Sequence, residues 1–194
     1  MIWVFAEERS GSTWFCETLS VKLGKSFTYL ERLEPENDHI HQTHNFSWVS
    51  QVDGVLLRTT RRDKLEHFLS VALLNSVAHT QWWHRPHVFR QHYKTDAAAL
   101  AEVFPGEPLT VSESDVDAYF EKLRERDRLW ACRHQAGQVI HYEDLDKGVF
   151  VEALGVSIGF SDSDITVKLP YSKRDLIANI QQVETWVKER TWTG

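Results

Sequence analysis

The residues best suited to chemistry lie near the start of the chain, where positions 9–14 read Arg-Ser-Gly-Ser-Thr-Trp directly after a short apolar run. A buried strand that turns into a helix over small residues leaves the first helical N–H groups without partners, and the helix dipole favours an anion there. Gly11 allows close approach of a ligand to the backbone, and Arg9 adds a positive fork. The hydroxyls of Ser12 and Thr13 add donors. The pattern predicts a cradle for phosphate or sulfate, and an ordinary turn with a serine N-cap is the alternative.

Two common nucleotide-binding patterns are missing at this loop. Walker A requires GxxxxGK[ST], but no glycine precedes Gly11 and no lysine follows it there, and GxGxxG is also missing. The loop instead resembles the 5′-phosphosulfate-binding loop of sulfotransferases that use 3′-phosphoadenosine 5′-phosphosulfate (PAPS). In that family (Lys or Arg)-Ser-Gly-(Ser or Thr)-Thr follows the first strand, with a Trp next in the cytosolic branch. The resemblance implies that the donor is bound by Arg9, Ser10, Gly11, Ser12, Thr13 and Trp14.

A second match lies at the end of the apolar segment 53–59. The family holds the 3′-phosphate with an Arg at a strand end and a Ser eight residues later, and Arg62 and Ser70 have that spacing here. Helical geometry alone does not bring residues eight apart together, so this assignment follows from the resemblance. An Arg fork and a hydroxyl would select a 3′-phosphorylated nucleotide over ATP or ADP. The alternative is a helix start with solvated cations.

The resemblance also suggests a catalytic base. Gln42-Thr43-His44 matches a family Lys-Thr-His segment whose His takes the proton from the acceptor hydroxyl, and imidazole titrates near neutrality. Gln42 departs from the family Lys and removes one positive charge. Glu31, after the second expected strand, is the rival base, because branches with Arg in the loop tend to use a carboxylate there. A surface role is the alternative for both His44 and Glu31.

The remaining site residues follow from the same resemblance. Arg9 would stabilise the charge that builds on the departing phosphate, so the scheme requires no metal. Trp14 would stack on the adenine, with a core position as the alternative, and Tyr142 of Tyr-Glu-Asp-Leu would approach the purine. Lys173 and Arg174 would replace a C-terminal Arg-Lys-Gly element of the family, or form a solvated helix start. The product would be 3′-phosphoadenosine 5′-phosphate (PAP).

Alternating strands and helices must position these residues. We expect a strand in the apolar run that begins at Ile2, a strand over 26–30 that is rich in aromatic and branched residues, and a short extended piece over 39–44. Buried strands are expected over 53–59 and 138–142. Helical periodicity and caps predict helices after the loop to Gly24, over 63–79, from Ser112 and Asp115 to near Gly137, over about 145–154, and from Ser172 and Asp175 onward.

The segment 80–108 lacks a single period and is expected to be a loop with a short helix near 97–102. Its Trp82, Trp83 and His84 would line an acceptor pocket or pack in the core. The whole pattern predicts one domain over 1–194 with an α/β fold, in which a mostly parallel sheet forms the middle of three layers, as in P-loop-like sulfotransferases. Ligands would bind beyond the carboxyl ends of the strands.

Composition limits the classes of partner. The 194 residues carry 22 Lys and Arg against 28 Asp and Glu, a net charge of −6, so no basic surface for nucleic acid or an anionic membrane is expected. No apolar run approaches the roughly 20 residues of a membrane span, and two distant cysteines, Cys16 and Cys132, favour a reducing cytoplasm. The acceptor would be a small molecule or glycan. A nucleotide kinase and a binding protein without catalysis are the competing interpretations.

Overall fold

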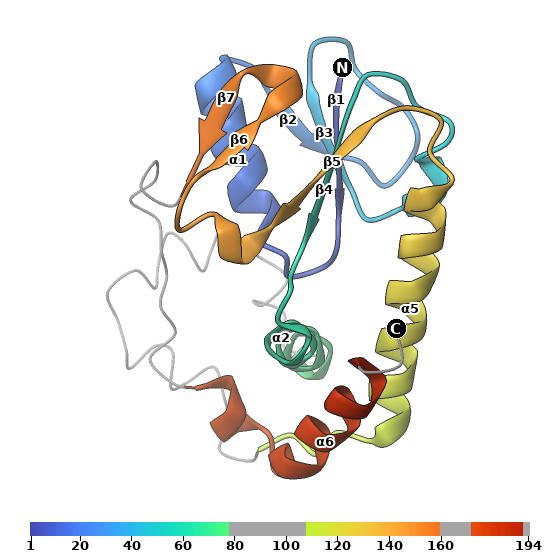
Figure 1. The fold of residues 1–194 in the computed structure, drawn as a ribbon, viewed down its shortest axis with the longest axis vertical. Helices are drawn as coiled ribbons and strands as arrows, with labels where there is room; N and C mark the ends of the chain where they lie inside the picture. The colour runs from blue at the N-terminus through green and yellow to red at the C-terminus, as the bar shows by residue number, and fades with distance from the viewer. Residues whose placement is uncertain (78–107, 160–171, 192–194) are drawn as a thin grey trace. The chain divides into compact units, whose positions relative to one another are not determined.

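The computed structural model describes residues 1–77, 108–159 and 172–191 (Figure 1). The chain divides into two compact units, one made of residues 1–62 and 122–164 and the other of residues 63–121 and 165–194.

The first unit is built on a five-stranded sheet in the order β2-β3-β1-β4-β5, in which all neighbours are parallel. The strands are β1 (Ile2–Ala6), β2 (Phe27–Tyr29), β3 (Ile40–Thr43), β4 (Val55–Thr60) and β5 (Gly137–His141). The five expected strands are therefore confirmed. Because β1 lies between β3 and β4, the chain crosses from one side of β1 to the other between those two strands.

Helices flank this sheet on both faces, which is consistent with the three layers expected from the sequence (Figure 1). The helices of the unit are α1 (Ser12–Leu23) and the second part of α5 (Glu113–Ala131). Along β1, Ile2 and Val4 belong to the core beneath α1, whereas Trp3 and Phe5 belong to the core that contains Trp130 of α5. This alternation explains why β1 is apolar at every position.

The segment after β5 differs from the expected helix over 145–154. It forms a short 3-10 turn η2 (Tyr142–Asp144), then an antiparallel hairpin of β6 (Val149–Val151) and β7 (Val156–Ile158) around the 3-10 turn η3 (Glu152–Leu154). Gly148 has a positive φ and interrupts the helical run, and Val149 and Val151 after it favour a strand. The prediction of a helix here was wrong.

The second unit contains α2 (Lys64–Val77), the first part of α5, the 3-10 turn η5 (Lys173–Leu176) and α6 (Ile180–Thr191). The expected capping box of α5 is confirmed, because the Asp115 carboxylate accepts from the Ser112 N–H at 2.9 Å and the Ser112 hydroxyl accepts from the Asp115 N–H at 3.2 Å. This helix ends at Ala131, before the expected end near Gly137.

The last helix also begins later than expected. Ser172 caps η5 through its contact with the Arg174 N–H, but Ile177 then becomes extended and forms a parallel bridge with Leu109. The Asn179 side chain bonds both backbone groups of Val111. The chain therefore breaks between η5 and α6, because its backbone pairs with another segment at that point. The expected loop and helix over 80–107, with Trp82, Trp83 and His84, lie outside the described residues.

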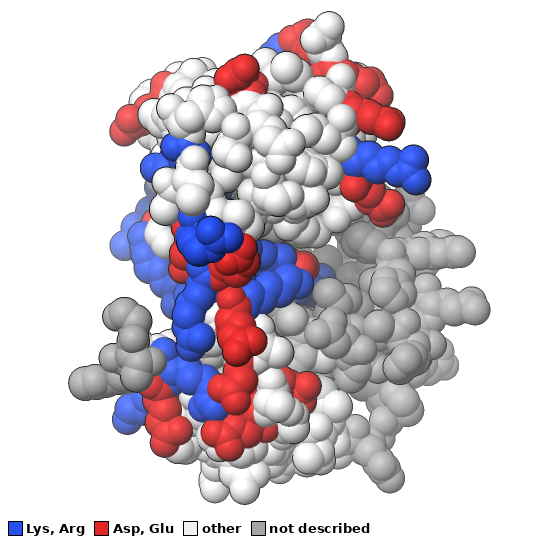
Figure 2. All heavy atoms as spheres, turned by 90° about the vertical axis from the view of Figure 1, so that its right-hand side faces the viewer, with Lys and Arg blue, Asp and Glu red and all other residues white. Residues whose placement is uncertain are grey.

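The surface on the face that Figure 2 displays carries Lys and Arg side chains interspersed with Asp and Glu side chains.

None of the helices within the described ranges has the length and apolar character needed to cross a bilayer. Among the same residues, no three His, Cys, Asp or Glu side chains are grouped so that they could hold a metal ion.

Candidate anion-binding site

Five of the residues singled out in the sequence follow the five parallel strands of the first unit. Arg9 follows β1, Glu31 follows β2, His44 follows β3, Arg62 follows β4 and Tyr142 follows β5, each within three residues of the strand end. Because the strands are parallel, all five residues lie along the carboxyl edge of one sheet. The topology therefore places these candidates at the edge where ligands of α/β proteins bind.

The loop after β1 is tightly fastened to β4. The Glu7 N–H donates to the Thr59 carbonyl at 3.1 Å, and the Ser10 hydroxyl lies 2.8 Å from the Thr59 hydroxyl. The Glu7 carbonyl in turn accepts from the Ser10 hydroxyl at 2.7 Å and the Ser10 N–H at 3.2 Å. Ser10 is buried, and Arg9 and Gly11 on either side have left-handed backbones with φ of 62° and 76°. Ser10 thus fixes the loop, while its neighbours turn the chain into α1.

The start of α1 has no side-chain cap. The N-cap is Gly11, which has no side chain to cap the helix, and the first turn carries no acidic residue. The alternative of a serine N-cap is therefore not what the structure shows. The Gln42 side-chain N–H donates to the hydroxyl oxygen of Ser12 at 2.9 Å, and both side chains are buried. Because Ser12 accepts this bond, its own proton remains available for another acceptor, such as an anion.

Two arginines belong to the segments that meet at this helix start, Arg9 in the loop after β1 and Arg61 directly after β4. Arg61, at the end of β4, stacks over the Tyr142 ring with 4.0 Å between the guanidinium carbon and the ring centroid. The same ring packs against Gly11, where a Cβ would lie 2.6 Å from its Cδ2. Part of the Arg9 side chain is exposed, yet protein atoms crowd its guanidinium, and this burial together with the charge of Arg61 lowers the pKa of Arg9. An anion bound near Arg9 and Arg61 would offset the repulsion between their charges.

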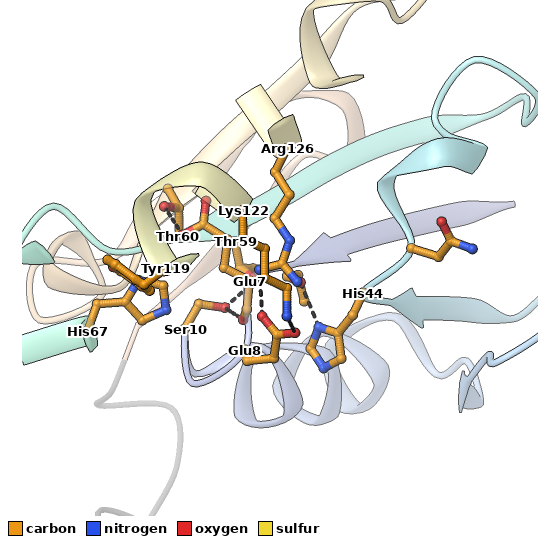
Figure 3. A network of polar contacts seen from close by, with 12 residues as sticks. Glu7, Glu8, Ser10, His44, Thr59, Thr60, His67, Tyr119, Lys122 and Arg126 are labelled. Atoms are coloured by element: carbon orange, nitrogen blue, oxygen red, sulfur yellow. Dashed lines mark hydrogen bonds and ion pairs between the residues drawn. The ribbon is translucent and has the colours of Figure 1, made fainter. Parts of the chain in front are cut away.

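The geometry of His44 suits a proton acceptor. Its Nδ1 lies 2.6 Å from the carbonyl oxygen of Ala6, the last residue of β1 (Figure 3). A carbonyl can only accept, so Nδ1 carries the proton, and in the neutral ring Nε2 has a free lone pair. Burial lowers the pKa of His44 and outweighs the Ala6 bond and the charge of Glu8, which raise it, while the charges of Arg126 and Lys122 lower it further. Half-buried His44 is therefore held as a neutral base.

Glu31, the rival base, is exposed and lies just after the edge strand β2. Between the two candidates, Tyr29 packs its ring 5.4 Å from the His44 ring, measured between centroids. Burial and the charges of Glu31 and Glu8 raise the pKa of Tyr29, which keeps its hydroxyl protonated. The structure thus adds Tyr29 to this end of the sheet, and the sequence had not singled it out.

A buried ionic network that the sequence did not predict lies beneath the loop. The fully buried Glu7 carboxylate accepts from Arg58 and from the Thr60 hydroxyl, both at 2.6 Å. Arg58 also pairs with Asp127 of α5 at 2.6 Å. This network joins the ends of β1 and β4 to α5. In the sequence, Glu7 directly follows an apolar strand and Arg58 lies inside another. The sequence does not show that these two residues pair, because the pairing depends on the order of the strands in the sheet.

A second carboxylate of the loop binds two cations of α5. Glu8 pairs with Lys122 at 2.7 Å and with Arg126 at 2.5 Å (Figure 3). Burial alone would raise the pKa of Glu8, but the hydrogen bonds and charges of Arg126 and Lys122 lower it far below its usual value. Glu8 therefore stays ionised, and the loop is anchored to α5 as well as to β4.

Arg62 is engaged within the first unit. Its guanidinium forms a two-pronged contact with the Asp144 carboxylate, and its backbone N–H donates to both oxygens of Glu143 at 3.1 and 3.0 Å. Ser70 belongs to the second unit, where its hydroxyl donates to the Glu66 carbonyl at 2.9 Å within α2. Trp14 is 8% exposed and lies in the core beneath α1.

The two cations expected near the C-terminus lie in the second unit and meet carboxylates there. Lys173 binds Glu66 at 3.1 Å, and Arg174 contacts both Glu66 and Glu184. These carboxylates offset the unfavourable position of two cations at the start of η5.

In comparisons with known proteins, the chain matches no family model, no curated protein and no solved structure.

Proposed function

We propose that this chain is a sulfotransferase that moves a sulfuryl group from PAPS to a hydroxyl or amine of a small molecule or glycan. The observation that carries the proposal is that Arg61 stacks on the Tyr142 ring, which packs against Gly11 at the uncapped start of α1, in the loop that also carries Arg9. Backbone donors, a helix dipole and two guanidinium groups together suit a doubly charged phosphosulfate. The same edge carries a neutral imidazole.

The chain's own residues would divide the work between binding and proton transfer. The amides at the start of α1 and the Ser12 hydroxyl would bind the 5′-phosphosulfate, and Arg62 would bind the 3′-phosphate. His44 Nε2 would take the proton of the acceptor hydroxyl as that oxygen bonds to sulfur. The bond from sulfur to the bridging phosphate oxygen breaks in the same displacement, and Arg9 would stabilise the charge that develops on that oxygen. The donor supplies the activated sulfuryl group and leaves as PAP.

One observation favours a second function, a nucleotide-binding protein without catalysis. Gln42 is neutral, buried and engaged with Ser12, at a position where the resembled enzymes carry a Lys. A protein of this kind would bind PAP yet transfer nothing, and its role would survive loss of His44. A Mg·ATP-dependent kinase is the other outcome that the test below separates.

The test is equilibrium binding of PAP, AMP, ADP and Mg·ATP by titration calorimetry, followed by transfer of labelled sulfate from PAPS to a panel of phenols, alcohols, amines and glycans. We expect PAP to bind more tightly than AMP, because only PAP carries a phosphate for Arg62. Preference for Mg·ATP would replace the proposal with a kinase. PAP binding without transfer to any acceptor would favour the non-catalytic protein.

Matched variants tie binding to the described site. Arg9→Gln and Arg62→Ala should each weaken PAP binding by at least about tenfold, the loss expected for a charge-assisted phosphate contact. Arg124→Ala, at an exposed position on α5, removes the same charge elsewhere and should leave the dissociation constant unchanged. Equal weakening by all three variants would indicate a general charge effect and would count against this site.

A further inference from the structure

The guanidinium and the backbone N–H of Arg62 both donate hydrogen bonds to neighbouring carboxylates. The guanidinium holds both oxygens of Asp144, with 2.6 Å between Nη2 and Oδ2, and the backbone N–H is held by the two oxygens of Glu143. A guanidinium fork and a backbone amide are the groups that proteins commonly offer to phosphate. The two carboxylates therefore occupy the position that an anionic ligand of Arg62 would take.

The contact is accessible and remains charged at neutral pH. The side chains of Arg62 and Asp144 keep 54% and 39% of their surfaces exposed, so a ligand can reach them without opening the core. The Arg62 hydrogen bonds and charge lower the pKa of Asp144, which keeps its carboxylate ionised. An exposed ion pair of this kind is weak enough for a dianion to displace it.

We propose that Asp144 is a specificity-determining residue that competes with the nucleotide's second phosphate for Arg62. This inference rests on the proposed function, because it takes Arg62 as the 3′-phosphate ligand. A nucleotide that lacks the second phosphate leaves the pair of Arg62 and Asp144 intact and gains nothing from Arg62. A 3′,5′-bisphosphate must replace the carboxylate, so Asp144 lowers the affinity for bisphosphates and leaves that for monophosphates unchanged.

Removal of the Asp144 charge should tighten the binding of a bisphosphate. Asp144→Asn keeps the size of the side chain but removes the competing charge, so it should tighten PAP binding by roughly two- to fivefold, in line with a weak exposed ion pair. AMP binding should stay the same. A residue that merely holds Arg62 in place would have the opposite effect, because its loss would weaken PAP binding.

The experiment measures PAP and AMP dissociation constants by titration calorimetry at fixed salt for the wild type, Asp144→Asn and Asp146→Asn. Asp146 is an exposed carboxylate two residues away, so its variant reports the general effect of removing one negative charge nearby. The inference requires tighter PAP binding in Asp144→Asn alone. The double variant Arg62→Ala/Asp144→Asn should bind PAP no more tightly than Arg62→Ala, because without Arg62 there is no guanidinium for which Asp144 and the phosphate could compete.

The possible failures are distinct. If PAP binds and Asp144→Asn leaves its affinity unchanged or lowers it, the competition is wrong while the proposed function stands. The competition is also wrong if Asp146→Asn tightens PAP binding to the same extent as Asp144→Asn. If no variant, including the wild type, binds PAP, the proposed function and the role of Arg62 are both overturned.

Discussion

Gly11 and Tyr142 pack so closely that a Cβ on Gly11 would lie 2.6 Å from Cδ2 and 2.8 Å from Cε2 of the tyrosine ring. The loop after β1 and the residue after β5 thus meet at a position where a side chain larger than that of glycine would collide with the Tyr142 ring. Gly11 also has a φ of 76°, which an L-residue adopts only at a cost. The close approach sets the distance between the start of α1 and the Arg61 that stacks on the ring.

Replacing this glycine should therefore damage both stability and the anion site. Gly11→Ala should lower the free energy of unfolding by roughly 2 to 4 kcal/mol, from left-handed strain together with overpacking against Tyr142. Gly24→Ala is the matched control, since Gly24 also has positive φ (62°) but a Cβ there meets nothing within 4 Å. It should cost only about 1 to 2 kcal/mol. Urea unfolding measures the free energy of unfolding of both variants. Equal losses in the two variants would show that a Cβ at position 11 does not overpack against Tyr142.

The buried carboxylate of Glu7 should be a major contributor to stability. Glu7→Ala leaves Arg58 and Thr60 buried without this partner, so the free energy of unfolding should fall by about 3 kcal/mol or more. Glu125→Ala removes a carboxylate from an exposed pair with Arg128 on α5 and should change stability little. Chemical denaturation compares the two variants, and a small loss for Glu7→Ala would mean that Asp127 alone satisfies Arg58.

Arg9 should matter for function and not for folding. Arg9→Gln keeps a long side chain at a left-handed position but removes a charge that burial and Arg61 disfavour, so thermal stability should stay the same or rise. Sulfuryl transfer should fall by about 100-fold or more in kcat, as when a donor to a developing oxyanion is lost. Steady-state kinetics and a melting curve on one preparation test both. A clear loss of thermal stability would assign Arg9 a structural role instead.

His44 should make stability depend on pH on the acid side of neutrality. Its pKa in the folded protein lies below the usual 6.5, so in the unfolded chain it takes up a proton at higher pH than in the folded protein. Stability should therefore decrease as the pH falls below about 6.5, and the decrease should level off below the folded pKa. His44→Gln should reduce this slope in urea unfolding measured at several pH values.

A second histidine provides the control for this pH dependence. His41 is buried on β3, its pKa is also lowered by burial, and its Nε2 lies 2.9 Å from the Glu36 carbonyl oxygen. His41→Gln should reduce the pH slope of stability in the same direction. Only His44→Gln should abolish transfer, and only the wild type and His41→Gln should keep an acid limb in the pH profile of kcat/KM. Full transfer by His44→Gln would move the role of base to Glu31.

Local patterns in the sequence determined the class of the fold. An apolar run such as residues 2–6 predicts a strand that is buried on both faces. This signal can be recognised from the sequence because it depends only on the residue types within the run. The turn at Gly11 and the helix after it were predictable for the same reason. The prediction failed over 145–154, where Gly148 interrupts the helix and the valines of β6 pair with β7 in a hairpin.

The partners of the polar residues were decided only by the tertiary structure. Glu7 and Arg58 are 51 residues apart, and Arg62 meets Asp144 across 82 residues, because parallel strands bring distant segments to one edge of the sheet. A sequence shows that a carboxylate or guanidinium is present, but its energy depends on burial and on which charge lies opposite. For this reason Arg9, His44 and Arg62 could be predicted as candidate site residues from the sequence, whereas their hydrogen-bond and charge partners became visible only in the fold.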